Sequence, residues 1–525
     1  MSLQSKENER VKKMAIKILF LVVFFASMIG IGLYCRKSAT DVNGFVLGGR
    51  SVGPWLTAFA YGTSYFSAVI FIGYAGQFGW KFGIASTWIG IGNAILGSLL
   101  AWVVLGRRTR IMTQTINSKT MPEFFEKRYG SKSLKILASI ITFIFLIPYT
   151  ASLYNGLSRL FEMAFGIDYM WCVIAMSILT GIYVIVGGYM ATAISDFIQG
   201  IIMLIGIVAV IWAVLASHGG FIGALKELSN VPVPDAAGPA AAEGAFASMF
   251  GPDPLSLLGV VILTSLGTWG LPQMIGKFYA IKSEKAISRG TIISTIFAVI
   301  VAGGCYFLGG FARISGVESV DGMPVGGFDA VIPKMLEGLP NILMAVVIVL
   351  VLSASMSTLS SLVLTSSSTL TLDFIKGSIA KNMSEKKQIS LLRVFVVIFI
   401  VISAVIAIFQ HKAGGGAVAF IAQLMGVSWG ALAGAFLAPF LCGLYIKWIT
   451  KAACFTSMIF GSGIMILNLL CRSAFPTLLQ SPINCGAFAM LAGLIIVPVV
   501  SAFTKKPSSE LVDGAFAGIK QRLED

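Results

Sequence analysis

Histidine and charged residues are scarce in this chain. Of its 525 residues only two are histidine, and 12% are Asp, Glu, Lys or Arg. His218 and His411 lie far apart in the sequence, so they offer no imidazole cluster for a zinc site or a catalytic triad. The seven cysteines contain no CxxC pair, which argues against a disulfide framework and against a thiolate metal site.

Long apolar runs make up much of the sequence. Hydrophobic residues make up 57% of the chain, and its mean hydropathy is +0.89. Most runs approach or exceed the roughly 20 residues that cross the hydrocarbon of a bilayer. We therefore predict an all-α polytopic protein of the plasma membrane, with thirteen transmembrane helices embedded in the lipid bilayer. No small-residue cleavage pattern follows the first run, Ala15–Tyr34, so we interpret it as a retained helix and not a signal peptide.

The net charge of +15 comes from basic residues in short loops, without the interleaved aromatic residues of an RNA-binding surface. Nucleic acid is therefore not an expected partner. If the first helix runs from outside to inside, the cytoplasmic loops and tail hold 26 of the 38 Lys and Arg residues. This asymmetry predicts an external N-terminus and a cytoplasmic C-terminus. The exception is the segment 6–17, whose basic residues would lie outside or at the interface.

Two apolar helices, five apart in order, are interrupted by glycine, proline and polar residues. Such a pair is typical of a five-plus-five inverted repeat. The predicted parts are an N-terminal tail (1–14), a first transmembrane helix (15–35), a first repeat containing helices one to five (53–216), an external loop (217–254), a second repeat containing helices six to ten (255–445), two peripheral helices (451–503) and a cytoplasmic tail (504–525).

The two interruptions predict where ligands bind. The first is the small and polar stretch Tyr61–Ser67, and the second is the GTWGLPQ segment that begins at Gly267. An unwound helix leaves free carbonyls at membrane depth, which is tolerated only where they line a cavity or bind a ligand. We expect the ion and solute sites at these breaks.

A column of small hydroxyl residues occupies the helix that contains Ser353–Thr371. At helical spacing Ala354, Ser357 or Thr358, and Ser361 share one face. Neutral hydroxyl and carbonyl oxygens suit a dehydrated monovalent cation such as Na⁺. We interpret the column as half of a sodium site. The alternative is that these residues only let membrane helices pack closely and bond to one another.

Asp196 is the one acid well inside an apolar run. An acid at that depth is costly and needs a partner, which makes it a candidate functional residue. The alternative is a carboxylate that reaches up to the nearby cytoplasmic surface.

Three motifs resemble the sodium:solute symporter family, in order and over essentially the whole chain. They are GGRSVGPWLTA from Gly48, the GG(x)7DxxQ pattern from Gly187, and Ala-x-x-Ser-Thr from Ala354. The resemblance implies a LeuT-like fold with thirteen helices and the inverted repeat, Na⁺ as coupling ion and no other cofactor. Within the family the chain is most similar to the sodium/proline symporters, followed by pantothenate-type carriers.

The resemblance also implies ion sites. Family members hold the main sodium ion with carbonyls of the first broken helix and oxygens of helix eight, and some hold a second ion beside the acid of helix five. The residues that match the main site are Thr63, Phe66, Ala354, Ser357 and Thr358. Those that match the second site are Asp196, Ser360 and Ser361.

The resemblance places the solute between the breaks. The matching residues are Tyr65, Val69, Thr150, Thr264, Thr268 and Trp269. Tyr65 stands where proline carriers have an acid, and one valine and three threonines stand where they have aromatic rings. A pocket with more hydroxyls and fewer rings favours a different or more polar solute. We predict a sodium-coupled symporter that imports a small organic solute. An amino acid such as proline is the first choice, and pantothenate or another small carboxylate is the alternative.

Other classes of protein fit less well. The spans contain no pair of titratable groups at acid–base spacing, so we expect no enzyme. A solute sensor would need an output domain, and none is predicted. A channel is not excluded by the residues, but it would conduct without a saturable solute requirement. We expect Na⁺, the solute and the bilayer as partners, and no obligate protein partner.

Overall fold

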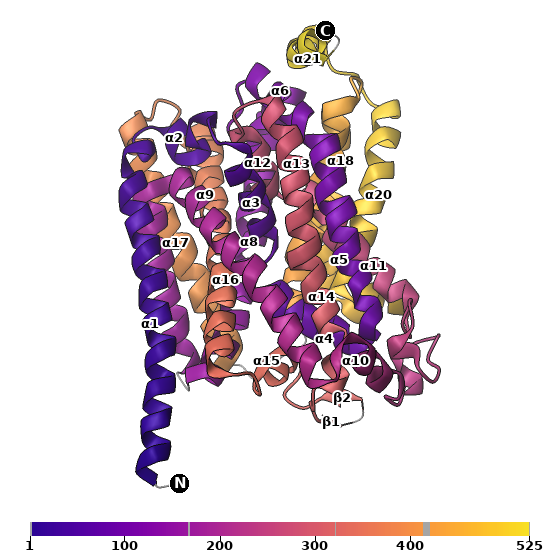
Figure 1. The fold of residues 1–525 in the computed structure, drawn as a ribbon. Helices are drawn as coiled ribbons and strands as arrows, with labels where there is room; N and C mark the ends of the chain where they lie inside the picture. Colours follow the sequence, from indigo (N-terminus) through magenta and orange to yellow (C-terminus); the bar gives the residue numbers. More distant parts are fainter. Residues whose placement is uncertain (1–2, 166–167, 321, 413–420, 524–525) are drawn as a thin grey trace.

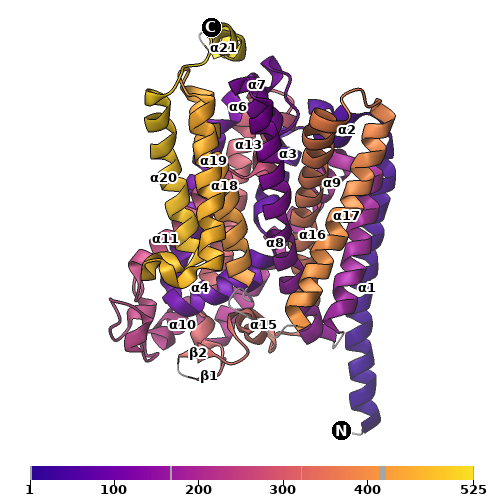
Figure 2. The ribbon, with the colours of Figure 1, turned by 180° about the vertical axis from the view of Figure 1, so that it is seen from behind.

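The computed structural model describes residues 3–165, 168–320, 322–412 and 421–523. Long helices run side by side between two polar ends (Figures 1 and 2). The helices are α1 (Leu3–Cys35), α2 (Val42–Leu47), α3 (Pro54–Tyr65), α4 (Ala75–Phe82), α5 (Thr87–Gly92), α6 (Arg107–Thr115), α7 (Met121–Tyr129), α8 (Lys132–Phe165), α9 (Tyr169–Ser217), α10 (Gly220–Ser229), α11 (Pro254–Leu266), α12 (Pro272–Ala280), α13 (Glu284–Ala298), α14 (Gly304–Gly309), α15 (Val331–Leu336), α16 (Asn341–Ser368), α17 (Glu385–Lys412), α18 (Ile421–Tyr445), α19 (Lys451–Leu470), α20 (Pro482–Phe503) and α21 (Ser509–Leu523).

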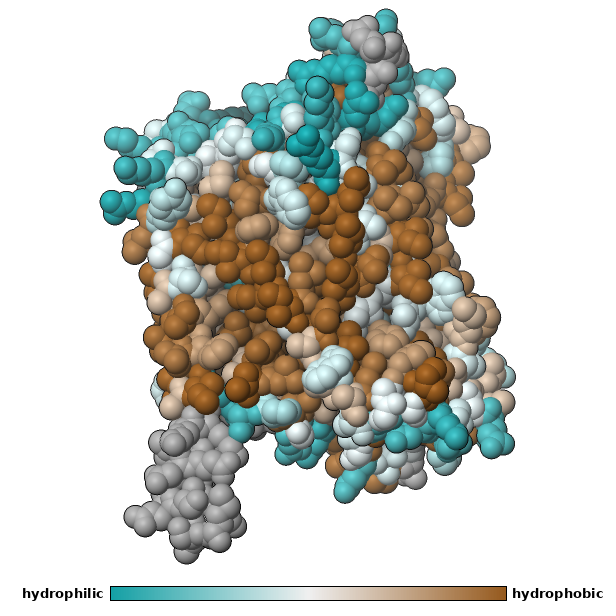
Figure 3. Space-filling view, viewed as in Figure 1, coloured by the Kyte–Doolittle hydropathy of each residue, from teal (hydrophilic) through white to brown (hydrophobic). Residues whose placement is uncertain are grey.

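The described residues include eleven helical segments that are long and apolar enough to cross a membrane. Two of them, Val69–Thr115 with 47 residues and Tyr169–Ser217 with 49 residues, have about twice the length of one crossing. An apolar belt separates two polar ends on the face shown in Figure 3. The two ends of the chain lie at opposite ends of the molecule, as an odd number of crossings requires (Figures 1 and 2). The number thirteen itself stays a prediction.

Both predicted helix breaks are present. α3 ends at Tyr65, and Phe66 is extended, with φ −82° and ψ 118°. α11 is followed by a 3-10 turn, Gly267–Trp269, and by Leu271 with φ −86° and ψ 120° before α12 begins. Phe66 and Leu271 thus have similar extended backbone angles. Each break leaves backbone carbonyl oxygens outside a regular helix.

A third interruption lies inside α9. Gly188 has φ 55° and ψ −149°, a conformation open to glycine and costly for other residues. It divides the 49 residues of α9 into two parts, before and after Gly188. A Cβ at this position would also lie 3.0 Å from the Phe45 carbonyl oxygen.

α18 packs against both broken helices. A Cβ added at Gly73, in the π-helical stretch that follows the first break, would lie 2.8 Å from the Ile421 side chain. One added at Gly267, in the second break, would lie 3.0 Å from the Trp429 ring. Nearly every residue of α18 is buried. Small residues therefore allow one helix to lie close to both breaks.

The structure adds three details to the expected organisation. α1 begins at Leu3, so the predicted tail 1–14 continues the helix from that residue; its Glu, Gln, Lys and Arg residues are good helix formers. The predicted tail 504–525 contains helix α21, which buries one apolar face and places Phe516 beside the Arg128 guanidinium. The all-α description needs one addition, a two-stranded antiparallel ladder of β1 (Ser319–Val320) and β2 (Met323–Pro324).

The crossing of α18 and α19 generates a test of the packing. A Cβ added at Gly461 would lie 2.2 Å from the Gly434 carbonyl carbon, whereas one added at Gly463 meets no atom within 4 Å. We expect Gly461→Ala to lower the apparent melting temperature of detergent-purified protein by several degrees, because overpacking costs about 1–3 kcal/mol. Gly463→Ala is the control on the same helix and should leave it unchanged or slightly raised. Equal melting temperatures for the two variants would contradict this close approach.

Candidate functional site

Five oxygens predicted for the main sodium site lie together where α16 passes the first break. The Ser357 hydroxyl donates to the Thr63 carbonyl at 3.1 Å, and the Thr358 hydroxyl donates to the same carbonyl at 3.0 Å. The Thr358 hydroxyl is also 3.4 Å from the Phe66 carbonyl oxygen. Both hydroxyls contact the Ala354 carbonyl at 3.1 Å. We call these five residues the oxygen cluster; each has an exposed fraction of 0%.

The chemistry of the oxygen cluster fits a monovalent hard cation. Three carbonyls and two hydroxyls supply lone pairs without a formal charge, and sulfur and imidazole ligands are absent from these five residues. A divalent ion such as Ca²⁺ is usually held by several carboxylates. Within the part of the chain that the structure describes, no group of three or more His, Cys, Asp or Glu residues could hold a metal ion.

A buried ion pair lies beside the oxygen cluster. Lys277 Nζ on α12 is 3.7 Å from Asp196 Oδ2 on α9 and donates to Ser361 Oγ on α16 at 3.0 Å. Ser361 Oγ is 2.7 Å from Ser64 Oγ on α3, and the Ser64 hydroxyl also bonds to the Ala60 carbonyl at 2.5 Å. We call Asp196, Lys277, Ser361 and Ser64 the lysine cluster.

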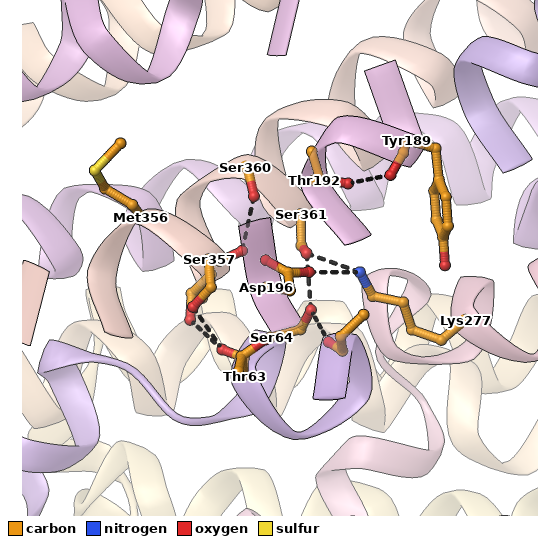
Figure 4. Close-up of polar contacts among 12 residues, drawn as sticks. Thr63, Ser64, Tyr189, Thr192, Asp196, Lys277, Met356, Ser357, Ser360 and Ser361 are labelled. Carbon is orange, nitrogen blue, oxygen red and sulfur yellow. Dashed lines mark hydrogen bonds and ion pairs between the residues drawn. The ribbon is translucent and has the colours of Figure 1, made fainter. Parts of the chain in front are cut away.

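The two clusters are neighbours along both helices (Figure 4). Thr63 belongs to the oxygen cluster and the next residue, Ser64, belongs to the lysine cluster. On α16, Thr358 and Ser361 stand almost one turn apart and contribute to one cluster each. A change at the contact between α3 and α16 therefore affects both clusters.

Of the three residues predicted for a second sodium site, two lie in the lysine cluster. Asp196 and Ser361 both approach Lys277. The Ser360 hydroxyl instead donates to the Ser357 carbonyl at 2.9 Å, within its own helix. The alternative of a carboxylate that reaches up to the surface is wrong for Asp196, whose exposed fraction is 0%.

Lys277 was missed as a site residue. Lys277 was expected in a basic cytoplasmic loop, but it lies in α12 and is only 3% exposed. A signal was present, because Lys277 follows Met274 and Ile275 and precedes Phe278 and Tyr279 in an otherwise apolar segment. A lysine enclosed in this way needs a buried partner, and Asp196 is that partner.

The residues predicted for the solute pocket are all buried, and the polar groups of four of them already have hydrogen-bond partners. The Thr150 and Thr264 hydroxyls bond to carbonyls of their own helices. The Thr268 hydroxyl and the Trp269 indole nitrogen bond to the carbonyls of Gly97 and Leu96, at 3.1 and 2.9 Å. The second break thus uses Thr268 and Trp269 to hold the neighbouring helical segment. Val69, the last of the set, is fully buried in the π-helical stretch after the first break.

An aromatic group lies between the first break, α8 and α18. The Trp429 ring on α18 is 5.8 Å from the Tyr65 ring and 5.9 Å from the Tyr149 ring. The Tyr65 hydroxyl is buried and has no hydrogen-bond partner among the described residues. Such a group is costly unless a ligand or water satisfies it. Trp429 was not predicted, although a single large ring among the small residues of its segment is a signal.

Two cavities lie toward opposite ends of the molecule. A cavity of about 330 Å³ lies near β2 and is lined by Gln77, Lys81, Asp253 and Arg313 among others. A smaller cavity of about 40 Å³ lies near the start of α7 and is lined by residues that include Lys277. Burial lowers the pKa of Arg313 to about 10, so its guanidinium is still charged at neutral pH.

Known proteins resemble this chain in sequence and in fold. A sodium/proline symporter of Staphylococcus aureus (strain JH9) is 29% identical over 506 residues, which cover 94% of this chain and 93% of the relative. The structure of a Na⁺-coupled sialic acid symporter in its substrate-bound outward-open state matches with a TM-score of 0.72 at 15% identity, over 94% of this chain and 99% of that one.

A more distant fold match is a nucleobase-cation-symport-1 family transporter in a closed conformation, with a TM-score of 0.50 at 14% identity, over 90% of this chain and 97% of that one. These structural matches show that the helix arrangement is that of known secondary transporters. The model of the sodium:solute symporter family matches residues 45–461. The chain therefore belongs to the sodium:solute symporter family.

Proposed function

We propose that this protein imports a small organic solute together with Na⁺, which binds at the oxygen cluster. The observation that carries the proposal is the convergence of five neutral oxygens from the first break and α16 in a fully buried position. Sodium at this position would be held by Thr63, Phe66, Ala354, Ser357 and Thr358.

A bound Na⁺ would connect the first break with α16, and this connection would couple ion binding to solute binding. The Ser357 and Thr358 hydroxyls donate to the Thr63 carbonyl, so both hydroxyl protons would turn away when their oxygens face a cation. The ion would then attach the first break to α16 and fix the conformation of the residues beside the solute. A conformational equilibrium shifts only as far as the ligand binds one state better than the other.

The driving force of one ion is substantial. A charge that moves inward through 100 mV releases about 2.3 kcal/mol, which supports about fifty-fold accumulation of a neutral solute. Any inward Na⁺ concentration gradient adds to this value.

We place the solute at the aromatic group of Tyr65, Tyr149 and Trp429, next to the oxygen cluster along α3. An amino acid such as proline is the first choice, supported by the similarity to a sodium/proline symporter. Pantothenate or another small carboxylate is the alternative, because the 330 Å³ cavity presents Lys81 and Arg313. We propose this cavity as the external entrance.

The proposed topology places the N-terminus outside and the C-terminus in the cytoplasm. The basic helices α6 and α7 lie at the same end as α21 (Figure 2), in agreement with the positive-inside rule. Thirteen crossings with two inverted repeats of five helices account for the opposite termini and for the two broken helices.

The direct test of the function is uptake into proteoliposomes. Radiolabelled proline, other small amino acids, pantothenate and short monocarboxylates are offered with an inward Na⁺ gradient, and the same solutes are offered with K⁺ in its place. Accumulation of one compound only with Na⁺ supports the proposal. Conduction without a saturable solute requirement would favour a channel instead.

The oxygen cluster generates a prediction for sodium activation. Thr358→Ala and Ser357→Ala each remove one of five ligands, and we expect the half-saturating Na⁺ concentration for uptake to rise about tenfold, or about 1.4 kcal/mol. Ser355→Ala is the matched control, because its hydroxyl is buried in the same helix and bonds to the Val351 carbonyl at 2.7 Å. Unchanged sodium activation in both site variants would remove the ion from this cluster.

The aromatic group generates a prediction for the solute. Tyr65→Phe removes the hydroxyl that has no described partner, and we expect a higher KM for the solute with little change in sodium activation. Tyr61→Phe is the control one turn away in α3, because the Tyr61 hydroxyl donates to the Gly97 carbonyl at 2.8 Å. A KM that rises only in the Tyr61 variant would show that the solute binds elsewhere.

A further inference from the structure

We propose that Lys277 is a built-in cation at the second ion position, so that the protein binds one Na⁺ and not two. The proposal rests on the proposed function, because it concerns the number of ions that the symporter carries. Its basis is the lysine cluster, where an ammonium group lies among oxygens that a second sodium ion would need.

The position of the ammonium is fixed by three groups. Nζ is 3.7 Å from Asp196 Oδ2 and 3.0 Å from Ser361 Oγ, and it lies 5.3 Å from the centre of the Tyr189 ring. An ammonium has three donors and no acceptor, so an acid, a hydroxyl and an aromatic face are suitable partners. Figure 4 shows Nζ directed at Asp196 and Ser361, with Tyr189 beside the lysine stem.

Burial explains why a positive charge is needed at this position. The Asp196 and Lys277 side chains are 0% and 4% exposed. An isolated carboxylate at such depth is very costly, and a charge of opposite sign compensates it. In a carrier with two sodium ions the ion provides this charge only while it is bound. Here the lysine provides it throughout the cycle.

The same geometry argues against a sodium ion in addition to the lysine. An ion bound to Asp196 and Ser361 would lie within a few ångströms of Nζ, where two like charges repel strongly because little water screens them. The third expected ligand, the Ser360 hydroxyl, bonds to the Ser357 carbonyl. The residues therefore do not fit a second Na⁺ while Lys277 is present.

The lysine also performs the structural task of an ion. Through its three partners and Ser64 it connects α12, which follows the second break, with α9, α16 and α3. A bound Na⁺ would leave this position into the cytoplasm in each cycle, but Lys277 is part of the chain and stays. The lysine cluster thus links the two broken helices without consuming an ion.

The 40 Å³ cavity lies next to Lys277, so a variant without its ammonium group can test whether a second Na⁺ then binds. It touches Lys277 and Ser361 and extends to Thr120 at the start of α7. Removal of the ammonium would enlarge this space and open Asp196 to ions. Lys277→Met keeps much of the stem and deletes only the charge, so it should create the second sodium site.

The experiment counts ²²Na⁺ ions bound per purified, monodisperse protein at saturation. We expect one ion for the wild type, two for Lys277→Met, and one for the double variant Asp196→Asn/Lys277→Met, in which both charges are removed. Lys135→Met is the matched control, because Lys135 is a buried lysine that pairs with Glu126 in another part of the molecule; it should bind one ion.

Each outcome decides between the alternatives. Two ions in the wild type would overturn the proposal, and so would one ion in folded Lys277→Met. If Lys277→Met does not fold, one ion in both the wild type and the double variant supports the proposal, and two in the wild type overturns it. No bound ion in the wild type would instead contradict the proposed sodium site at the oxygen cluster, so the two failures are distinguishable.

Discussion

The contact between the break in α3 and the hydroxyl column of α16 is the constraint on which the rest of the structure depends. At the break, backbone carbonyls lose their helical partners at membrane depth, where each unsatisfied group is costly. The Ser357 and Thr358 hydroxyls satisfy them, and the same hydroxyl and carbonyl oxygens can hold a cation. One set of atoms thus stabilises the irregular backbone and makes it responsive to an ion. Gly73 and Gly267 allow α18 to pack closely against the two broken helices.

Few charged groups lie near this contact. The oxygen cluster is neutral, and the neighbouring acid, Asp196, is paired with Lys277. If Na⁺ binds as proposed, its entry would change the net charge of the two clusters, and the bound ion would respond to membrane voltage. The proposed solute position beside Tyr65 and Trp429 lies next to these groups along α3, so a change in the conformation of the break would affect the ion and the solute together.

Much of the fold could be predicted from the sequence, because each main feature has a local signal. Apolar runs of span length predicted the helices, and Gly, Pro and polar residues within two of them predicted the breaks at Tyr65 and Leu271. The spacing of Ala354, Ser357 and Thr358 predicted that they share one face of α16, and the family resemblance predicted that this face meets the first break. The side-chain orientation at the second break could not be predicted, because Thr268 and Trp269 find their partners in residues more than 170 positions away. Lys277 and Trp429 each have a local signal that was overlooked, but their partners lie in helices that only the tertiary fold brings near.

The most direct test of the central claim needs no solute and no variant. The melting temperature of the purified protein is measured over a series of Na⁺ concentrations, with K⁺ added to keep the ionic strength constant. A ligand that binds the native state stabilises it by RT ln(1 + [L]/Kd), so the oxygen cluster predicts a rise that follows a one-site curve with Na⁺ and is absent with K⁺ alone. Identical melting temperatures at every ratio of Na⁺ to K⁺ would contradict a sodium site between α3 and α16.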